Sequence, residues 1–197
     1  MTSASAIRHR VLLGFAVVAL SASGLRGQSS PELDTLLAPH RLAMRALTSL
    51  NGEWRGTGWT LLGSGEKASF TQRIRVGSAG EGALKIIEGR SYGDRGRLGS
   101  TNFEIISFNQ STKIYTLRLY TNGNVADVPI APTANGFKLE YPVEDAMIHF
   151  TVAIANGVWS EVAERWTKGK DPVRFLELTL QKVGETDWPG AGTVPPD

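Results

Sequence analysis

The sequence contains no cysteine in its 197 residues. Thiol catalysis, thiolate metal sites and disulfides are therefore excluded, because each requires a cysteine sulfur. Histidine is also scarce, and beyond the first 27 residues only His40 and His149 occur, in different predicted elements. This pair lacks the ligand spacing of a zinc site. We expect no bound metal, and the fold must be held together by its core.

A strong charge of either sign is missing as well. The formal charge is +2 at pH 7, but three of the 21 basic side chains, Arg8, Arg10 and Arg26, fall in the first 27 residues, which hold no acidic residue. Without them the 19 acidic side chains are in slight excess. A near-neutral protein lacks the basic surface that binds phosphate backbones, so we expect no nucleic-acid partner.

No hydrophobic run is long enough to cross a membrane as a helix. The longest, Val11–Leu20, is shorter than the roughly 20 residues that a bilayer requires. Arginines precede it and small residues follow, which is the order of regions in a secretory signal peptide. We predict a signal peptide over residues 1–27, cleaved between Ser23 and Gly27, and a mature protein in the periplasm or outside the cell without a transmembrane segment. The alternative is an uncleaved anchor or a core helix.

Short apolar or alternating runs separated by turn residues fill residues 51–183. Asn-Gly pairs at 122–123, 135–136 and 156–157 indicate hairpins, because both residues tolerate the positive φ of a type I′ turn. Consecutive hairpins form a meander, which avoids exposed edges best by closing on itself. We predict an all-β fold, a closed antiparallel up-and-down barrel of about ten strands, near Trp54–Leu61, Ala68–Val76, Leu84–Tyr92, Asn102–Phe108, Lys113–Tyr120, Val125–Ile130, Phe137–Tyr141, Ala146–Ala155, Val158–Thr167 and Val173–Val183.

The ends of the chain lie outside this barrel. Residues 28–50 form an N-terminal helical segment, which starts with Ser30 as cap and Pro31 as first helical residue. We expect Pro39 to divide it into two helices and the segment to cap one barrel end. The proline-containing residues 184–197 are expected to be a flexible C-terminal tail.

The hairpin turns predict which side chains share a face. A two-residue turn at Asn156-Gly157 pairs Ile154 with Trp159, Val152 with Glu161, Phe150 with Ala163 and Ile148 with Arg165. The aliphatic row should point inward and would take Glu161 and Arg165 with it, while a one-residue slip would put both outside. Buried charges need partners, so these two form either a structural polar network or a ligand-orienting site.

The leading hypothesis is a non-enzymatic barrel that binds a small, partly apolar or amphipathic molecule. The turn at Asn122-Gly123 places Arg118 beside Asp127 and Tyr120 beside Val125. Pockets of this kind are mostly apolar with a few convergent polar groups. We expect Arg118, Glu161 and Arg165 to orient the ligand between walls formed by Trp54, Tyr115, Tyr120, Phe150 and Trp159.

Two other functions stay open. The last hairpin allows either Glu177 or Leu178 to lie beside Glu161, and the first choice would give the paired carboxylates of a hydrolase or isomerase at the barrel mouth. The other is a cell-envelope interaction module with a filled barrel, which an apolar patch outside the barrel would favour. We favour binding over catalysis.

Several motifs resemble known barrel families. Gly52-Glu53-Trp54, after the Leu47–Asn51 segment, resembles the Gly-x-Trp opening of lipocalin-like barrels, and the stretch to Ile87 is similar to nitrobindin-type barrels. The Trp-x-Glu strand Trp159–Glu161, followed by the final Phe-x-Glu-x-Thr-Leu strand Phe175–Leu180, is similar to exported bacterial calycin-like domains of unknown function.

This resemblance implies that Trp54 closes one barrel end under a basic residue of the final strand, for which Arg174 is the candidate. Nitrobindin-like proteins bind haem through a late histidine, which the final strand here lacks. No haem or other cofactor is expected.

Overall fold

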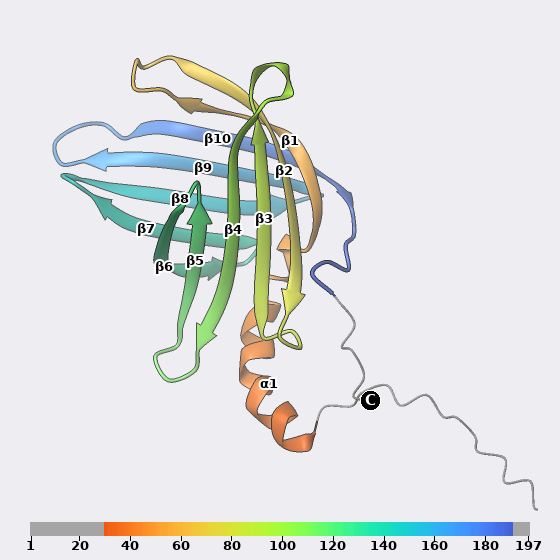
Figure 1. Ribbon diagram of the computed structural model, residues 1–197. Helices are drawn as coiled ribbons and strands as arrows, with labels where there is room; N and C mark the ends of the chain where they lie inside the picture. The colour runs from red at the N-terminus through yellow and green to blue at the C-terminus, as the bar shows by residue number, and fades with distance from the viewer. Residues whose placement is uncertain (1–29, 191–197) are drawn as a thin grey trace, which may run out of the picture.

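The computed structural model describes residues 30–190, which form one closed antiparallel barrel and one α-helix (Figure 1). Each strand pairs with its sequence neighbours, and β1 pairs with β10 to close the barrel. The predicted all-β, ten-stranded, up-and-down architecture is confirmed. The strands are β1 (Gly52–Leu61), β2 (Lys67–Ala79), β3 (Leu84–Tyr92), β4 (Leu98–Asn109), β5 (Ile114–Thr121), β6 (Asn124–Thr133), β7 (Gly136–Val143), β8 (Ala146–Ala155), β9 (Val158–Thr167) and β10 (Val173–Gly184).

The predicted signal peptide over residues 1–27 lies outside the described residues. Within residues 30–190, no helix is long and apolar enough to cross a membrane.

The β5–β6 and β8–β9 hairpins have the predicted turns and registers. Asn122 and Gly123 have φ of 47° and 84°, and Asn156 and Gly157 have φ of 52° and 74°, as type I′ turns require. All four predicted pairs between β8 and β9 are present. Both predicted pairs between β5 and β6 are also present.

The β6–β7 turn lies one residue earlier than the Asn-Gly signal indicated. Thr133 pairs with Gly136, so Ala134 and Asn135 form the loop and Gly136 opens β7. A Cβ on Gly136 would come within 2.1 Å of the Val152 carbonyl oxygen on β8. Glycine is needed here because two backbones approach closely.

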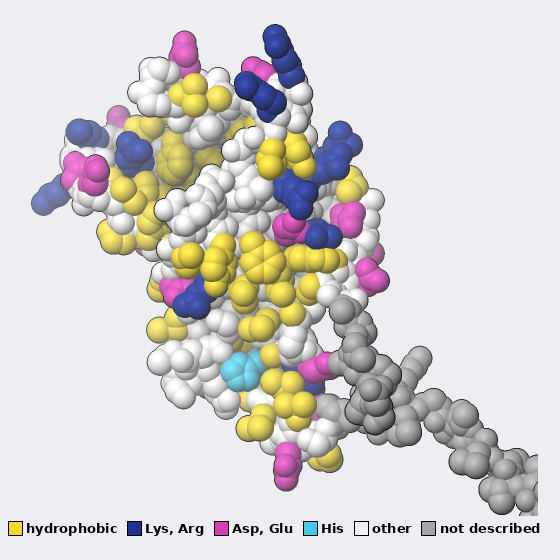
Figure 2. All heavy atoms as spheres, in the orientation of Figure 1, with side chains coloured by type: hydrophobic (Ala, Val, Ile, Leu, Met, Phe, Trp, Pro, Cys, Tyr) yellow, Lys and Arg dark blue, Asp and Glu magenta, His cyan; other side chains and the backbone are white. Residues whose placement is uncertain are grey.

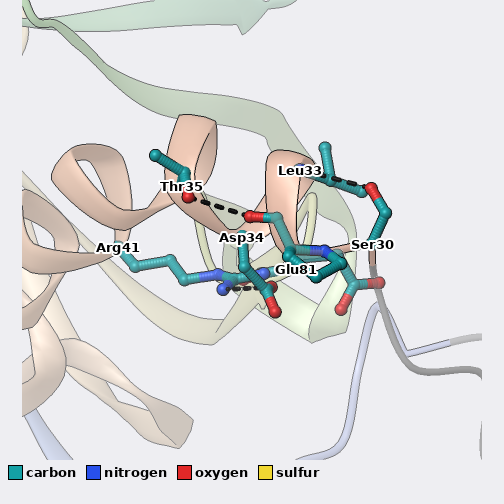
Figure 3. A network of polar contacts seen from close by, with 7 residues as sticks. Ser30, Leu33, Asp34, Thr35, Arg41 and Glu81 are labelled. Atoms are coloured by element: carbon teal, nitrogen blue, oxygen red, sulfur yellow. Dashed lines mark hydrogen bonds and ion pairs between the residues drawn. The ribbon is translucent and has the colours of Figure 1, made fainter.

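Helix α1 (Pro31–Arg45) starts as the sequence predicts. The Ser30 hydroxyl accepts a hydrogen bond from the Leu33 N–H at 3.3 Å (Figure 3). The predicted division at Pro39 is wrong, because the helix continues through it to Arg45. Proline removes one main-chain donor, and the turns beyond Pro39 pack on the barrel, where Ala43 and Met44 are buried.

Arg41 ties this helix to the turn between β2 and β3. Its Nε donates to the Glu81 carbonyl oxygen at 2.7 Å, and its Nη1 lies 3.0 Å from Asp34 Oδ1 (Figure 3). The helix therefore lies at the barrel end that carries the β2–β3 turn (Figure 1).

This end of the barrel is closed by packed side chains. The 3₁₀ turn η1 (Thr48–Leu50) follows α1, and both Leu47 and Leu50 are fully buried beside Trp54. Trp54 donates its Nε1–H to the Leu50 carbonyl oxygen at 2.9 Å and lies edge-on to Trp159, with ring centroids 5.7 Å apart. The predicted helical cap at one end of the barrel is confirmed.

After β10 the chain turns back over the outside of the barrel. The Trp188 ring lies under the Arg75 guanidinium at 4.2 Å and edge-on to Phe103 at 6.5 Å. A Cβ on Gly77 would come within 1.7 Å of the Trp188 carbonyl oxygen, so this glycine of β2 makes room for the segment. Within the predicted tail, 184–197, Trp188 and Pro189 thus lie against the barrel, and residues 191–197 lie outside the described residues.

Candidate ligand-binding cavity

A cavity of about 740 Å³ occupies the barrel above the closed end. It reaches Leu62 after β1 and Gly93 after β3, so it opens at the end of the barrel opposite α1. Figure 2 shows a recess near the top of the molecule with hydrophobic side chains in its depth. The apolar wall includes Phe70, Ile74, Ile87, Leu117, Leu119, Val128, Phe137, Leu139, Phe150, Val152, Leu176 and Leu178.

Two carboxyl groups enter this apolar cavity from different strands. Glu104 of β4 is paired with Ile87 and Leu119, and Glu161 of β9 is paired with Val152 and Leu178. All four partners line the cavity together with both carboxylates. The alternation of strands therefore fixes both groups on the inner face.

Asn102 orients the first carboxyl group. Its Nδ2 donates to Glu104 Oε1 at 2.5 Å. A Cβ on Gly89, which faces Asn102 across β3 and β4, would lie 2.0 Å from Asn102 Oδ1. Glycine at this position leaves the space in which Asn102 reaches Glu104.

Burial changes the titration of both acids. It raises the pKa of Glu104 to about 7; the hydrogen bond from Asn102 opposes this rise, and the charge of Glu161 adds to it. Burial also raises the pKa of Glu161, opposed by a hydrogen bond from Trp159 Nε1 to Glu161 Oε2 at 3.3 Å. A proton is therefore retained in this pair at pH values where exposed carboxyl groups have lost theirs.

Among the described residues, the lining of the cavity contains no lysine, arginine or histidine. The buried Lys85 lies on the inner face of β3, where its Nζ donates to Asn51 Oδ1 at 2.7 Å and to Ser78 Oγ at 2.8 Å. Neither acceptor lines the cavity. The two carboxyl groups thus have no basic partner in the lining.

Some of the predicted site residues surround the cavity. Phe150, Trp159 and Glu161 line it. Trp54 lies beneath it in the closed end, where it contacts Trp159. Tyr115 is on the inner face but reaches the helix, because its hydroxyl donates to the Ala43 carbonyl oxygen at 3.1 Å.

Three predicted ligand-binding residues are not in the cavity. Arg118 and Tyr120 are exposed on the outer face of β5, where Arg118 pairs with Asp127 at 2.6 Å. The prediction that they point inward is wrong because Leu117 and Leu119 take that face. Arg165 has the inner-face register, opposite Ile148, but is exposed and does not line the cavity. A long side chain near a strand end keeps its charge in water.

Of the two registers left open for the last hairpin, the structure has the one without a Glu161–Glu177 pair. Leu178 lies beside Glu161, whereas Glu177 pairs with Val162 in the register and faces outward. Its carboxylate accepts a hydrogen bond from Arg174 Nη1 at 3.0 Å. The carboxylate that accompanies Glu161 inside the barrel is Glu104.

Arg174 does not close the barrel over Trp54. It pairs with Glu177 and with Glu164, near the start of β10. A cation over the Trp54 ring is Lys182, the register partner of Trp54, with its Nζ 5.9 Å from the ring centroid. The expected basic residue of the final strand is present, but at the other end of that strand.

The pattern Gly89-x-Ser91-x-Gly93 occurs in the chain without the setting of a catalytic serine. Ser91 lies within β3, rather than at a turn from a strand into a helix, and its Oγ is 2.7 Å from Ser100 Oγ. The described lining also holds no histidine to complete a catalytic triad with this serine.

The fold is similar to that of a solved protein structure. The crystal structure of Rv2717c from M. tuberculosis aligns with a TM-score of 0.53 and 13% sequence identity, over 71% of this chain and 96% of that chain. At this identity the similarity shows the barrel fold alone. No family model matches the sequence, and no curated protein matches it.

Proposed function

We propose that this protein binds a small, partly apolar molecule inside its barrel and does not catalyse a reaction on it. The cavity of about 740 Å³ carries this proposal. Its volume falls in the roughly 300–1,000 Å³ range of small-molecule sites, and its wall is apolar with few polar groups, as in such sites. The polar groups that would orient the ligand are Glu104, Asn102, Glu161 and Gln72.

The two other hypotheses have less support. A hydrolase or isomerase that uses Glu161 and Glu177 as a pair lacks its geometry, because Glu177 faces outward. A filled-barrel interaction module would use exposed apolar side chains on the outer face, and Leu98, Tyr120 and Val125 are such residues. However, the cavity of about 740 Å³ does not fit a barrel filled with side chains. The Rv2717c similarity is compatible with binding but identifies no ligand.

We also propose that the protein is exported to the periplasm or secreted after cleavage of residues 1–27. The charged, apolar and small-residue regions of that segment support this. N-terminal sequencing of the protein isolated from its host is expected to give a start between Ser23 and Gly27. A chain that retains Met1 in the cytoplasm would refute the export proposal and leave the binding proposal intact.

A blocking substitution tests the binding proposal. Ala126 is exposed and lines the open end of the cavity from β6, so the indole of Ala126→Trp would obstruct its mouth. The neutral dye N-phenyl-1-naphthylamine is expected to bind the unaltered protein saturably, at one dye per barrel, with quenching of tryptophan emission. We expect Ala126→Trp to weaken this binding at least tenfold.

Ala131→Trp is the matched control. Ala131 is exposed and lies on the same strand, but on the outer face by register. It is expected to bind dye as the unaltered protein does. Absence of saturable binding, or equal affinities for the two variants, would overturn the proposal.

A further inference from the structure

We propose that the bound molecule is a cationic amphiphile, an organic amine whose ammonium group lies against Glu104 and Glu161 and whose apolar part contacts the cavity wall. This inference rests on the proposed function and names the ligand class that fits the site. Four features of the described residues support it.

The first feature is an acidic pair without a counter-charge. Two carboxyl groups enter the same apolar cavity, and their charges interact unfavourably. Burial of charge is costly unless it is paired. No basic side chain occurs in the described lining, Lys85 donates to Asn51 and Ser78, and Arg165 is exposed. A cation supplied by the ligand provides the missing partner.

The second feature is the set of free acceptors. Glu104 uses Oε1 for Asn102, and Glu161 uses Oε2 for Trp159. The other oxygen of each carboxyl group has no hydrogen-bond partner among the described residues. An ammonium group carries up to three N–H donors and no acceptor, so it matches carboxylate oxygens in an otherwise apolar site.

The third feature is independent of the acidic pair. Gln72 of β2 is only 8% exposed, lies on the inner face and lines the cavity. Its side-chain amide has no hydrogen-bond partner among residues 30–190. No fully buried side-chain nitrogen or oxygen among the described residues lacks a hydrogen-bond partner, so the Gln72 amide is accessible from the cavity, where a polar group of the ligand can bond to it. Its carbonyl oxygen adds an acceptor facing the same cavity.

The fourth feature excludes a bare metal ion or a small hydrophilic amine. Most of the wall is apolar, with Leu117, Val128, Phe137 and Phe150 among its side chains. A small polar cation would leave this surface in contact with water. An amine that carries an alkyl or aromatic group covers the wall and gains the free energy of apolar burial.

Binding of such a cation shifts a proton. The titratable side chains in the described lining are Glu104, Glu161 and Tyr141. Burial keeps Glu104 partly protonated near neutral pH, since it raises the pKa of this group to about 7. An ammonium ion beside Glu104 favours the ionised form. Binding near pH 7 should therefore release a proton, and affinity should rise from pH 5 to pH 8.

Three compounds of equal chain length separate charge from apolar contact. Decylamine, decanol and decanoate, each below its aggregation concentration, are titrated calorimetrically into the full chain at pH 7. We expect decylamine to bind at least tenfold more tightly than decanol and decanoate to bind most weakly. Glu104→Gln and Glu161→Gln should each lose at least tenfold in affinity for decylamine and keep their affinity for decanol.

Glu53→Gln is the matched control, because Glu53 is exposed on the outer face of β1. It should bind decylamine as the unaltered protein does. Repeating the titration in two buffers of different ionisation enthalpy should reveal proton release that is absent in Glu104→Gln.

The outcomes distinguish the two proposals. If neither the dye nor any of the three compounds binds, the binding proposal fails. If decanol or decanoate binds as tightly as decylamine and Ala126→Trp abolishes that binding, the cavity is a ligand site but the cationic class is wrong. Unchanged affinity of both Glu→Gln variants for decylamine would also overturn the inference.

Discussion

Replacing Trp54 with alanine is expected to lower the free energy of unfolding by about 3–5 kcal/mol, the usual cost of truncating a large core aromatic. Trp54 is 1% exposed and contacts Trp159 edge-on in the closed end of the barrel. The substitution removes this packing and leaves the Leu50 carbonyl oxygen without its donor. No neighbouring segment fills the space, because the strands are fixed by their ladders.

Urea unfolding followed by circular dichroism measures this loss. Trp54→Phe should cost less, since it keeps an aromatic ring but removes the indole N–H, and an unpaired buried acceptor costs about 1–3 kcal/mol. Trp166→Phe is the control: Trp166 is 47% exposed, and its replacement should change stability by less than about 0.5 kcal/mol. If Trp54→Ala lowers the free energy of unfolding by less than Trp166→Phe does, Trp54 does not stabilise the closed end.

Glu104→Gln is expected to stabilise the protein at pH 8 and to leave it nearly unchanged at pH 4. The pKa of Glu104 rises from 4.5 to about 7 on folding. Below pH 4.5 both folded and unfolded states are protonated, and the group contributes nothing. As pH rises from 4.5 to 7 the unfolded state ionises first, so stability falls, by roughly 3 kcal/mol when each pKa unit is worth about 1.4 kcal/mol.

Chemical denaturation at several pH values checks this sign. The difference in stability between Glu104→Gln and the unaltered protein should grow from pH 4.5 to pH 7 and then level off. Burial also raises the pKa of Glu161. A variant that combines Glu104→Gln with Glu161→Gln should therefore lose still more of the pH dependence of stability. Glu53→Gln should follow the unaltered protein throughout. The prediction is contradicted if the stability of Glu104→Gln, measured relative to the unaltered protein, is lower at pH 8 than at pH 4.

The architecture could be predicted from local sequence signals because the turns determine which strands pair and in which register. Asn122-Gly123 and Asn156-Gly157 have the positive φ values that only a few residues tolerate, and each fixes the pairs of its hairpin. The register then follows residue by residue, including Val152 beside Glu161. The turn at Asn135 was displaced by one residue because contact with β8 also selects glycine at Gly136.

The faces of β5 show why pairing alone does not define a site. The hairpin correctly paired Arg118 with Asp127 and Tyr120 with Val125, but pairing does not say which face is inside. Tyr115 and Tyr120 are five residues apart, so a regular strand with period two puts them on opposite faces. Only the closed barrel shows that Leu117 and Leu119 face inward.

Glu104 was missed for a related reason. Both faces of β4 carry apolar and polar residues: one has Asn102, Glu104 and Ile106, and the other has Thr101, Phe103, Ile105 and Ser107. Alternation therefore gives no preference, and no Asn-Gly turn borders the strand. The missed signal was Gly89, whose lack of a side chain makes room for Asn102 across the strand pair.

In the proposed function, the closed end beneath Trp54 would also govern the kinetics of ligand exchange. With α1 and η1 packed below the cavity, a bound molecule would enter and leave by one route, past the loops opposite the helix. Substitutions along that route that make no contact with the bound molecule change only the free-energy barrier that entry and exit share. They should slow or speed association and dissociation by the same factor, leaving the equilibrium constant as it was.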